Sequence, residues 1–255
     1  MRLRRILIVL GLAAASLLPV GPVEAADKSG AYERPVIGAV YGRGAAGPGS
    51  YAVLIDVSEI QKARAKPTRG ANCSNAGAEA GTYLYTGWKI SGNKTAHLNT
   101  ATVPSGLGSV TSALQSSWNA WRSADSAVPA VNVATDGTVT RYTANRSYDI
   151  LWGSTGGSLA TTYTWRWNDG TIESDVVFYK GVAWWQAPSE GDGCYETAGN
   201  VYDIANIATH EFGHAYGLDH PAGARFETMY AYGYSGETLK RSPALGDRNG
   251  VAALY

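Results

Sequence analysis

The stretch HEFGHAYGLDH, from His210 to His220, holds the side chains best suited to chemistry in this chain. On a helix, His210 and His214 lie one turn apart on the same face, so their imidazoles can bind one metal ion. Glu211 follows the first histidine, where its carboxylate can reach a water on the metal without being a ligand. Gly217 lets the chain leave the helix in a left-handed conformation, and His220 then approaches from another direction. Three neutral nitrogens and one open position are typical of a catalytic zinc, because structural zinc usually has four protein ligands.

The spacing of these residues makes the motif specific. HExxH alone is short enough to occur by chance, whereas HExxHxxGxxH adds a glycine and a third histidine at fixed distances. Three of the four histidines of the chain lie within these eleven residues. The alternative is an amphipathic helix with surface or core histidines, and the spacing favours the metal site over it.

The motif HEFGHAYGLDH resembles the zinc-binding motif of the metzincin metallopeptidases, most closely that of the matrixin-like branch in its secreted, bacterial type. Met229, nine residues after His220, resembles the methionine of the family's Met-turn, which passes beneath the zinc. Residues 246–255, GDRNGVAALY, are similar to the short final helix of matrixins. The resemblance is strong over residues 200–255, weaker over residues 81–200 and absent before them.

The fold that this resemblance implies is α+β, a metzincin-like zincin fold. It has a twisted, mostly parallel five-stranded sheet with two long helices, an active-site helix, the Met-turn and a short C-terminal helix. Residues 109–122 place apolar side chains at helical spacing, so we expect the first long helix there, with Trp118 and Trp121 in the core. Residues 201–218 are the expected active-site helix.

Runs of β-branched and aromatic residues between turn residues predict the strands. Residues 159–167 alternate, with Trp165 and Trp167 on one face, and the Asn-Asp-Gly sequence at 168–170 predicts a tight turn after them. By the resemblance, the edge strand of the sheet pairs with an extended substrate. Residues 159–167 are our candidate for it, which makes Trp165 and Trp167 candidate substrate-binding residues. The alternative, that these aromatics only pack against a neighbouring layer, stays open. The other expected strands are residues 82–90, 95–103, 131–133, 138–142, 148–152 and 175–179.

The loop after Met229 carries Tyr230 and Tyr232, two further candidate substrate-binding residues. In matrixins this loop walls the main specificity pocket and has a proline and a tyrosine at set distances from the methionine. Ala231 and Gly233 stand in those places here, so the family's pocket shape does not carry over. Ala231 also stands where other metzincins have a tyrosine ligand, so that role is not transferred.

The first 25 residues predict a signal peptide, with a basic start, an apolar run over residues 6–20 and small residues before the cleavage point. The run is shorter than the roughly 20 residues of a membrane helix, and an uncleaved anchor is the alternative. Residues 26–80, rich in Gly, Ala and Pro, are expected to be an N-terminal extension or propeptide. Residues 81–255 are the expected catalytic domain. We therefore expect a secreted, extracellular protein.

The charge balance bears on the partners. Cleavage after residue 25 leaves 18 of the 21 basic and 20 of the 21 acidic residues, a formal charge near −2. That charge does not suggest nucleic acid or an acidic membrane as a partner. We expect a protein or peptide substrate, no nucleic acid, no membrane contact after signal cleavage, and a monomer.

Cys73 and Cys194 are the only cysteines, and in an exported protein an even pair favours one disulfide. The family's propeptides suggest an alternative, in which Cys73 caps the zinc in a latent form. The residues around Cys73 do not match the family's switch motif, which favours the disulfide.

One catalytic zinc is the cofactor we expect. Matrixins often bind a second zinc through histidines of an upstream loop, and His97, the one histidine outside the motif, is too little for such a site. Residues 190–193 (EGDG) and the turn at 168–170 contain acidic and glycine residues that can hold calcium, although turn chemistry alone explains both.

The predicted function is that of a secreted zinc-dependent endopeptidase. In it, Glu211 takes a proton from a zinc-activated water and passes it to the leaving amine. The alternative is a zinc-binding secreted module, or a cell-wall-associated one, without turnover. A zinc amidase acting on cell-wall peptides would share the chemistry and differ in its substrate.

Overall fold

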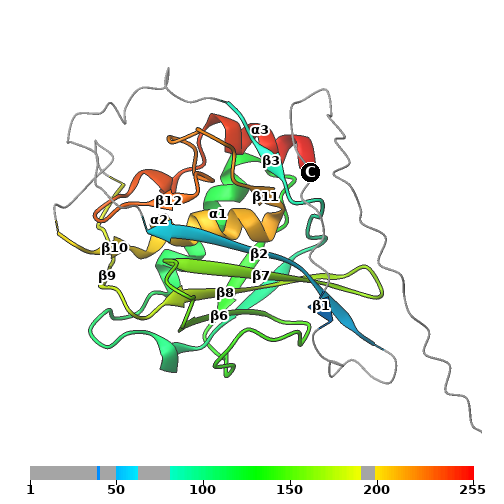
Figure 1. Cartoon of the computed structure of the whole chain (residues 1–255), viewed down its shortest axis with the longest axis horizontal. Helices are drawn as coiled ribbons and strands as arrows, with labels where there is room; N and C mark the ends of the chain where they lie inside the picture. Colours follow the sequence, from blue (N-terminus) through cyan, green and yellow to red (C-terminus); the bar gives the residue numbers. More distant parts are fainter. Residues whose placement is uncertain (1–38, 41–49, 63–80, 191–198) are drawn as a thin grey trace, which may run out of the picture.

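A twisted sheet is the centre of the fold (Figure 1). The computed structural model describes residues 39–40, 50–62, 81–190 and 199–255. Within these residues, eight strands form one sheet in the order β1-β2-β7-β8-β6-β4-β5, and β12 also pairs with β2. The strand bounds are Ala39–Val40 (β1), Ala52–Lys62 (β2), Lys94–Leu98 (β4), Val131–Ala134 (β5), Tyr148–Gly153 (β6), Ala160–Trp167 (β7), Ile172–Tyr179 (β8) and Tyr232–Gly233 (β12).

Five of these strands form the predicted, mostly parallel sheet. Strands β8, β6, β4 and β5 run parallel, and β7 runs antiparallel to β8. The tight turn between β7 and β8 lies where it was predicted, with Gly170 at φ +84° and its N–H donating to Trp167 O at 2.9 Å. The predicted fold class is therefore confirmed.

In the part of the chain that the structure describes, three α-helices accompany the sheet. Helix α1 spans Thr111–Ala124, α2 spans Ile204–Tyr216 and the short final helix α3 spans Leu245–Leu254, all close to the predicted ranges. None of the helices within the described ranges is long and apolar enough to cross a membrane.

Aromatic side chains join α1 to α2. Trp118 stacks on Phe212 with their ring centroids 3.8 Å apart. Trp121 Nε1 donates to Thr209 O at 2.8 Å. Both tryptophans are buried, as predicted for core residues. Helix α1 thus backs the face of α2 that is turned away from open solvent and holds it in place.

Some predicted strands are shorter than expected or absent. Residues 82–90 form only β3 (Leu84–Tyr85), which pairs with β11 (Leu218–Asp219), because Gly87 at φ +88° turns the chain. Residues 95–103 stop being a strand after Leu98, since Asn99 caps the 3-10 helix η2 (Thr100–Thr102). Residues 138–142 form no strand. The remaining elements are β9 (Trp184–Trp185), β10 (Tyr202–Asp203) and η3 (Leu239–Arg241).

Strand β2 lies next to β7, the strand that we expected at the edge of the sheet. It pairs antiparallel with β7 along the length of both strands, from Ala52 opposite Trp167 to Ile60 opposite Ala160. Since β7 also pairs with β8, residues 159–167 do not form the edge strand while β2 is in place, and the prediction is wrong for this arrangement of the chain. The physical reason is that residues 52–62, which we placed in the N-terminal extension, contribute a strand to the sheet.

Candidate active site

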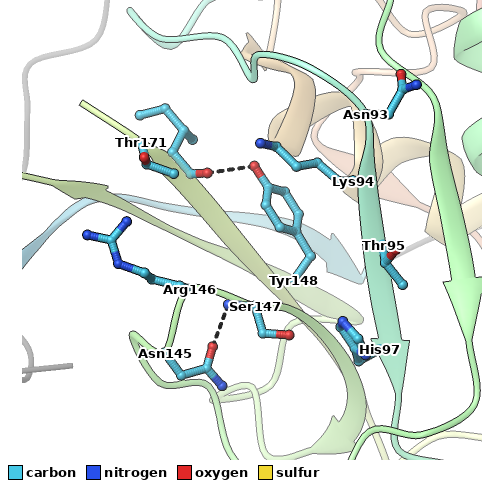
Figure 2. A pocket seen from close by; sticks show the side chains of 10 residues that line it. Asn93, Lys94, Thr95, His97, Asn145, Arg146, Ser147, Tyr148 and Thr171 are labelled. Atoms are coloured by element: carbon cyan, nitrogen blue, oxygen red, sulfur yellow. Dashed lines mark hydrogen bonds between the residues drawn. The ribbon is translucent and has the colours of Figure 1, made fainter. Parts of the chain in front are cut away.

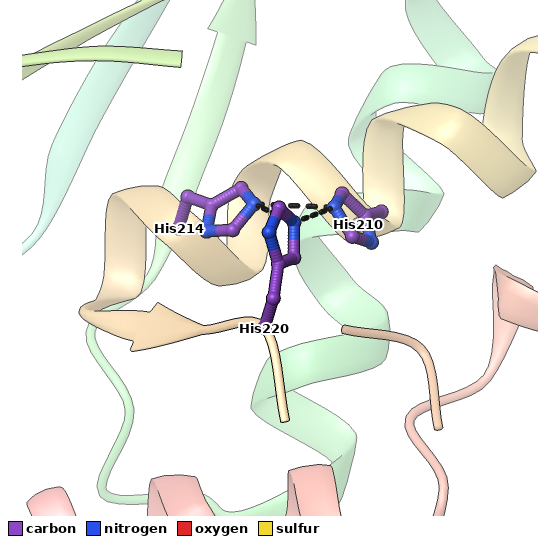
Figure 3. Close-up of side chains that lie close together, drawn as sticks. All are labelled: His210, His214 and His220. Atoms are coloured by element: carbon purple, nitrogen blue, oxygen red, sulfur yellow. Dashed lines mark hydrogen bonds between the residues drawn. The ribbon is translucent and has the colours of Figure 1, made fainter. Parts of the chain in front are cut away.

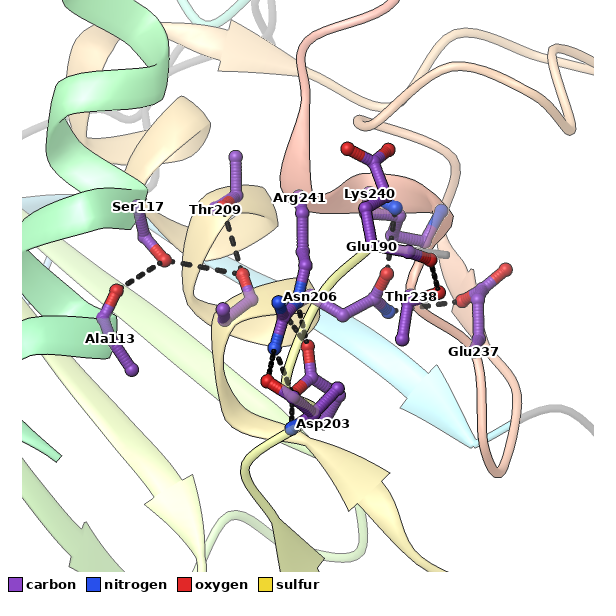
Figure 4. Close-up of polar contacts among 12 residues, drawn as sticks. Ala113, Ser117, Glu190, Asp203, Asn206, Thr209, Glu237, Thr238, Lys240 and Arg241 are labelled. Carbon is purple, nitrogen blue, oxygen red and sulfur yellow. Dashed lines mark hydrogen bonds and ion pairs between the residues drawn. The ribbon is translucent and has the colours of Figure 1, made fainter. Parts of the chain in front are cut away.

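Helix α2 is fixed at both ends, and Figure 4 shows the contacts at its start. At its start, the Asp203 carboxylate accepts from Asn206 N at 2.9 Å as an N-cap and pairs with Arg241 Nε at 2.7 Å. At its end, Gly217 has φ +107°, and a Cβ there would lie 2.1 Å from Trp88 O. Only glycine fits such a turn, which sends the chain back toward the helix as predicted.

Three histidine rings converge at one point (Figure 3). The Nε2 of His210 lies 2.9 Å from that of His220 and 3.1 Å from that of His214, and the last two are 3.0 Å apart. On the opposite side of the rings, His210 Nδ1 lies 2.6 Å from Thr228 O, and His214 Nδ1 lies 2.9 Å from Leu218 O. Because a carbonyl oxygen only accepts, both Nδ1 atoms carry the proton.

These rings fit a metal ion. A neutral imidazole protonated at Nδ1 has a lone pair at Nε2, and two lone pairs 3.1 Å apart repel unless a cation lies between them. Burial lowers the pKa of His210 well below its ordinary value, and the neighbouring His214 and His220 act in the same direction, so the neutral ring is favoured. Within the described ranges, these histidines are the one group of three side chains able to hold a metal ion. Three imidazole nitrogens suit zinc.

Glu211 is fully buried beside the histidines. Its Oε2 accepts from Thr162 Oγ1 at 2.5 Å, and its Oε1 accepts from Ile60 N at 3.2 Å. Burial raises the pKa of Glu211 to about 8, although these two hydrogen bonds act in the opposite direction. The carboxylate is thus held between the metal-binding helix and the backbone of β2.

Met229 packs directly against α2. It is buried, and a Cβ at Gly213 would lie 2.2 Å from Met229 Sδ. The buried Asp247 carboxylate holds this turn by accepting from Thr228 N at 2.5 Å and from Met229 N at 3.1 Å. Because Thr228 O also accepts from His210 Nδ1, the turn orients the first histidine.

Trp165 and Trp167 are not open to a substrate, since they are 0% and 1% exposed. They pack with Ala52 and Leu54 of β2, and Trp167 Nε1 donates to Glu173 Oε2 at 2.6 Å. The prediction that they bind substrate is wrong for the chain with β2 in place. The alternative of a packing role describes them, because β2 supplies the neighbouring side chains.

Tyr230 and Tyr232 lie on the loop that follows Met229. Tyr232 is 44% exposed, and its ring centroid lies 5.5 Å from that of the half-buried Tyr230. The Lys240 ammonium lies 5.2 Å from the Tyr230 ring centroid. A substrate contact for these two tyrosines stays a prediction.

The calcium and disulfide predictions fall largely outside the described residues, because Cys73, Cys194 and residues 191–193 are not among them. In the turn at 168–170, Asp169 accepts from Thr171 N at 2.9 Å and pairs with Arg146 at 2.8 Å. Protein donors therefore hold this carboxylate, which supports the explanation from turn chemistry.

His97 lies at a separate surface pocket of about 300 Å³ (Figure 2). The pocket opens at the N-terminal ends of β4 and β6, and His97 Nδ1 lies 2.7 Å from Asp136 Oδ1. His97 thus pairs with a carboxylate. The expectation of a single zinc stays a prediction.

Two residues at the site escaped the sequence interpretation. Ile60 lies in the segment that we expected to be an N-terminal extension or propeptide, and nothing local in the sequence indicates that it reaches Glu211. Thr162 stands on the polar face of an alternating strand, and that alternation was a usable signal.

Three imidazoles converge, two of them on α2 with Glu211 and the third after the turn that ends it, and they define a class, the zinc-dependent hydrolases. The family model Peptidase M10, matrixin, matches residues 94–255, more than half of the chain. The chain therefore belongs to the matrixin family of metzincins and is a zinc metalloendopeptidase. None of the curated proteins matches it.

Proposed function

We propose that this chain is a secreted endopeptidase in which His210, His214 and His220 hold the zinc and Glu211 is the general base. The observation that carries the proposal is the convergence of three Nε2 atoms beside a buried carboxylate of the same helix. Zinc bound there supplies an activated water and polarises the scissile carbonyl. Membership of the matrixin family supports the assignment.

The chain's own residues orient the metal ligands and the general base, and they protonate the leaving amine. The carbonyls of Thr228 and Leu218 fix the rings of His210 and His214 with Nε2 toward the metal, which also raises their basicity as ligands. Thr162 holds one oxygen of Glu211, so the other faces the backbone that runs beside α2. Glu211 accepts a proton from the attacking water and delivers it to the nitrogen of the leaving amine.

The substrate is a protein or peptide segment in an extended conformation. Tyr230 and Tyr232 border its path on the loop after Met229, where Tyr232 is exposed. The signal-like residues 1–25 support secretion, with residues 26–80 as an extension or propeptide before a catalytic domain at 81–255. A disulfide between the two cysteines is part of the same proposal.

The test is Glu211→Gln in the full chain. Glutamine keeps the shape and can still accept from Thr162, but it cannot take a proton, so casein cleavage should fall by about 10²-fold or more while zinc stays at one per chain. Glu173→Gln is the matched control, since Glu173 is an equally buried glutamate that bonds to Trp167 and lies on β8 instead of the metal-binding helix. Undiminished cleavage by Glu211→Gln, with zinc bound, would exclude this mechanism.

A further inference from the structure

Strand β2 lies between two segments that both pair with it. It runs antiparallel to β7 and parallel to β12, the short strand in the loop after Met229 (Figure 1). The position of β2 is therefore that of an extended peptide held on both edges by main-chain hydrogen bonds, beside the metal-binding helix. In this protein a segment of the same chain occupies it.

The main-chain bonds of Ile60 lie directly at the catalytic glutamate. Ile60 O accepts from Leu159 N at 2.9 Å, and the next residue, Gln61, donates from its N–H to Ala231 O at 2.8 Å. Between them, Ile60 N donates to Glu211 Oε1 at 3.2 Å. A base that protonates a leaving amine must lie at that nitrogen, and here the nitrogen beside Glu211 is that of the Glu59–Ile60 peptide bond.

The Ile60 side chain fills an apolar pocket. It is fully buried, and a Cβ built at Gly233 would lie 2.8 Å from Leu159 Cδ1, 3.1 Å from Ile207 Cδ1 and 3.2 Å from Ile60 Cδ1. The three aliphatic side chains thus meet at a glycine, and any side chain at position 233 would narrow the space. The Ile60 side chain is therefore closely packed with Leu159 and Ile207.

On the basis of the proposed function, we propose that β2 occupies the substrate cleft as a substrate and that Glu59–Ile60 is the bond that the chain presents to its own active site. Water adds to the carbonyl carbon of Glu59, the C–N bond breaks, and Glu211 carries the proton from the water to the Ile60 nitrogen. The products are a new carboxylate on Glu59 and a new amine on Ile60. External substrates of the same site are extended peptides with an isoleucine-sized apolar residue after the cleaved bond.

The experiment starts from the full chain, purified free of metal. Hydrogen exchange followed by mass spectrometry should show protected amides at Ile60 and Gln61 before any zinc is added. After addition of one equivalent of zinc, intact-mass measurement should show two fragments that meet between Glu59 and Ile60. Their rate of formation should not depend on protein concentration, because the strand and the site belong to one molecule. Glu211→Gln should stay uncut.

Two matched substitutions in β2 test the pocket. Ile60→Ala removes the side-chain atoms that meet Leu159 and Ile207 at Gly233, and Leu54→Ala removes a similar volume from the part of β2 that packs on Trp165. Ile60→Ala should slow the cut roughly tenfold or more, and Leu54→Ala should slow it clearly less. Equal slowing by both variants would mean that Ile60 has no special position, and the proposal would be wrong.

Other outcomes separate this proposal from the proposed function. A zinc-loaded chain that cleaves casein while Glu59–Ile60 stays intact overturns the proposal alone. Ile60→Asp, which places a charge among the apolar side chains around position 60, tests the case in which an uncleaved β2 blocks the site. If this variant cleaves casein, while the wild type does not and keeps its Glu59–Ile60 bond, the proposal is also overturned. Unprotected amides at Ile60 and Gln61 do the same. Zinc-loaded wild type and Ile60→Asp that both cleave nothing overturn the proposed function, and this proposal with it.

Discussion

Two clusters of titratable side chains among the described residues are satisfied in different ways. In the carboxylate cluster, formed by Asp149, Glu173 and Asp175, the partners are protein donors. Glu173 accepts from Asn145 N at 2.8 Å, Arg146 N at 2.7 Å and Trp167 Nε1 at 2.6 Å. In the histidine cluster, formed by His210, His214 and His220, the Nε2 atoms face one another at 2.9–3.1 Å.

The difference separates a structural role from a functional one. Buried carboxylates that accept from backbone N–H groups tie a loop to a sheet and need nothing further. Ring nitrogens whose lone pairs point at one another, with two of the three histidines buried, repel one another until a cation binds between them. Burial alone does not distinguish the two clusters. The direction in which the donors and lone pairs point does.

The sharpest test of the comparison is His214→Ala. Removing one of three ligands should abolish stoichiometric zinc and lower casein cleavage by about 10³-fold or more, since the metal supplies several kcal/mol to the transition state. Zinc content and the cleavage rate are measured together. His97→Ala is the control, because His97 lies in a separate pocket and pairs with Asp136. Full zinc occupancy in His214→Ala would remove the histidine cluster as the metal site.

A smaller effect is expected at the support of the histidine cluster, in Gly213→Ala. The added Cβ would lie 2.2 Å from Met229 Sδ and 2.6 Å from Trp121 Cζ2, so both side chains must move. We expect a loss of about 1–3 kcal/mol in the free energy of unfolding and a roughly 10–100-fold loss of zinc affinity. Urea unfolding and competition with a zinc chelator measure the two quantities.

The double variant Gly213→Ala with Met229→Ala sharpens the same test. Because Met229 contributes the closest of the colliding atoms, the two substitutions together should cost less than the sum of their separate costs. Additive losses would show that Met229 does not press on α2, and the Met-turn would then have no role in supporting the site.

The sequence was informative where the members of a group are neighbours along the chain. His210, His214 and His220 lie on one helix and the turn after it, so spacing alone predicts that they meet, and their convergence is confirmed. The same holds for α1, because Trp118 and Trp121 repeat at helical spacing and are buried. Local geometry decides such groups before any tertiary contact forms.

Contacts across long stretches of chain could not be predicted in this way. Ile60 and Glu211 are 151 residues apart, and Thr162 and Glu211 are 49 apart. Alternation correctly separated the two faces of β7, but it could not say which face meets α2. The threonine face does, with Thr162 and Thr164 fully buried, because their hydroxyls bond to Glu211 and Ser174. The sequence therefore left open whether the tryptophans bind substrate or pack, and it gave no role to the threonine face.

The smallest expected effect concerns the carboxylate cluster. It is a change with pH in the free energy of unfolding. Burial raises the pKa of Glu173 to about 7 against an ordinary value of 4.5, so between these values the folded chain keeps a proton that the unfolded chain has lost. The free energy of unfolding that Glu173 contributes must fall as the pH rises through this window, by a few kcal/mol at most, about 1.4 per pKa unit.

Glu173→Gln isolates this contribution in the metal-free chain. The variant should be less stable than the wild type at pH 5, because its amide N–H₂ faces a donor. The gap, meaning the difference in the free energy of unfolding between wild type and variant, should narrow by pH 8. Urea unfolding at the two pH values measures it, and taking the difference between variant and wild type cancels the titration of the histidines. In the control Asp169→Asn the gap should stay constant, because hydrogen bonds from Thr171 lower the pKa of Asp169 to about 2, below the measured range. A gap that widens with pH for Glu173→Gln would mean that Glu173 is held as a carboxylate. The carboxylate cluster would then carry buried negative charge. It would differ from the neutral histidine cluster in charge as well as in the direction of its hydrogen-bond donors.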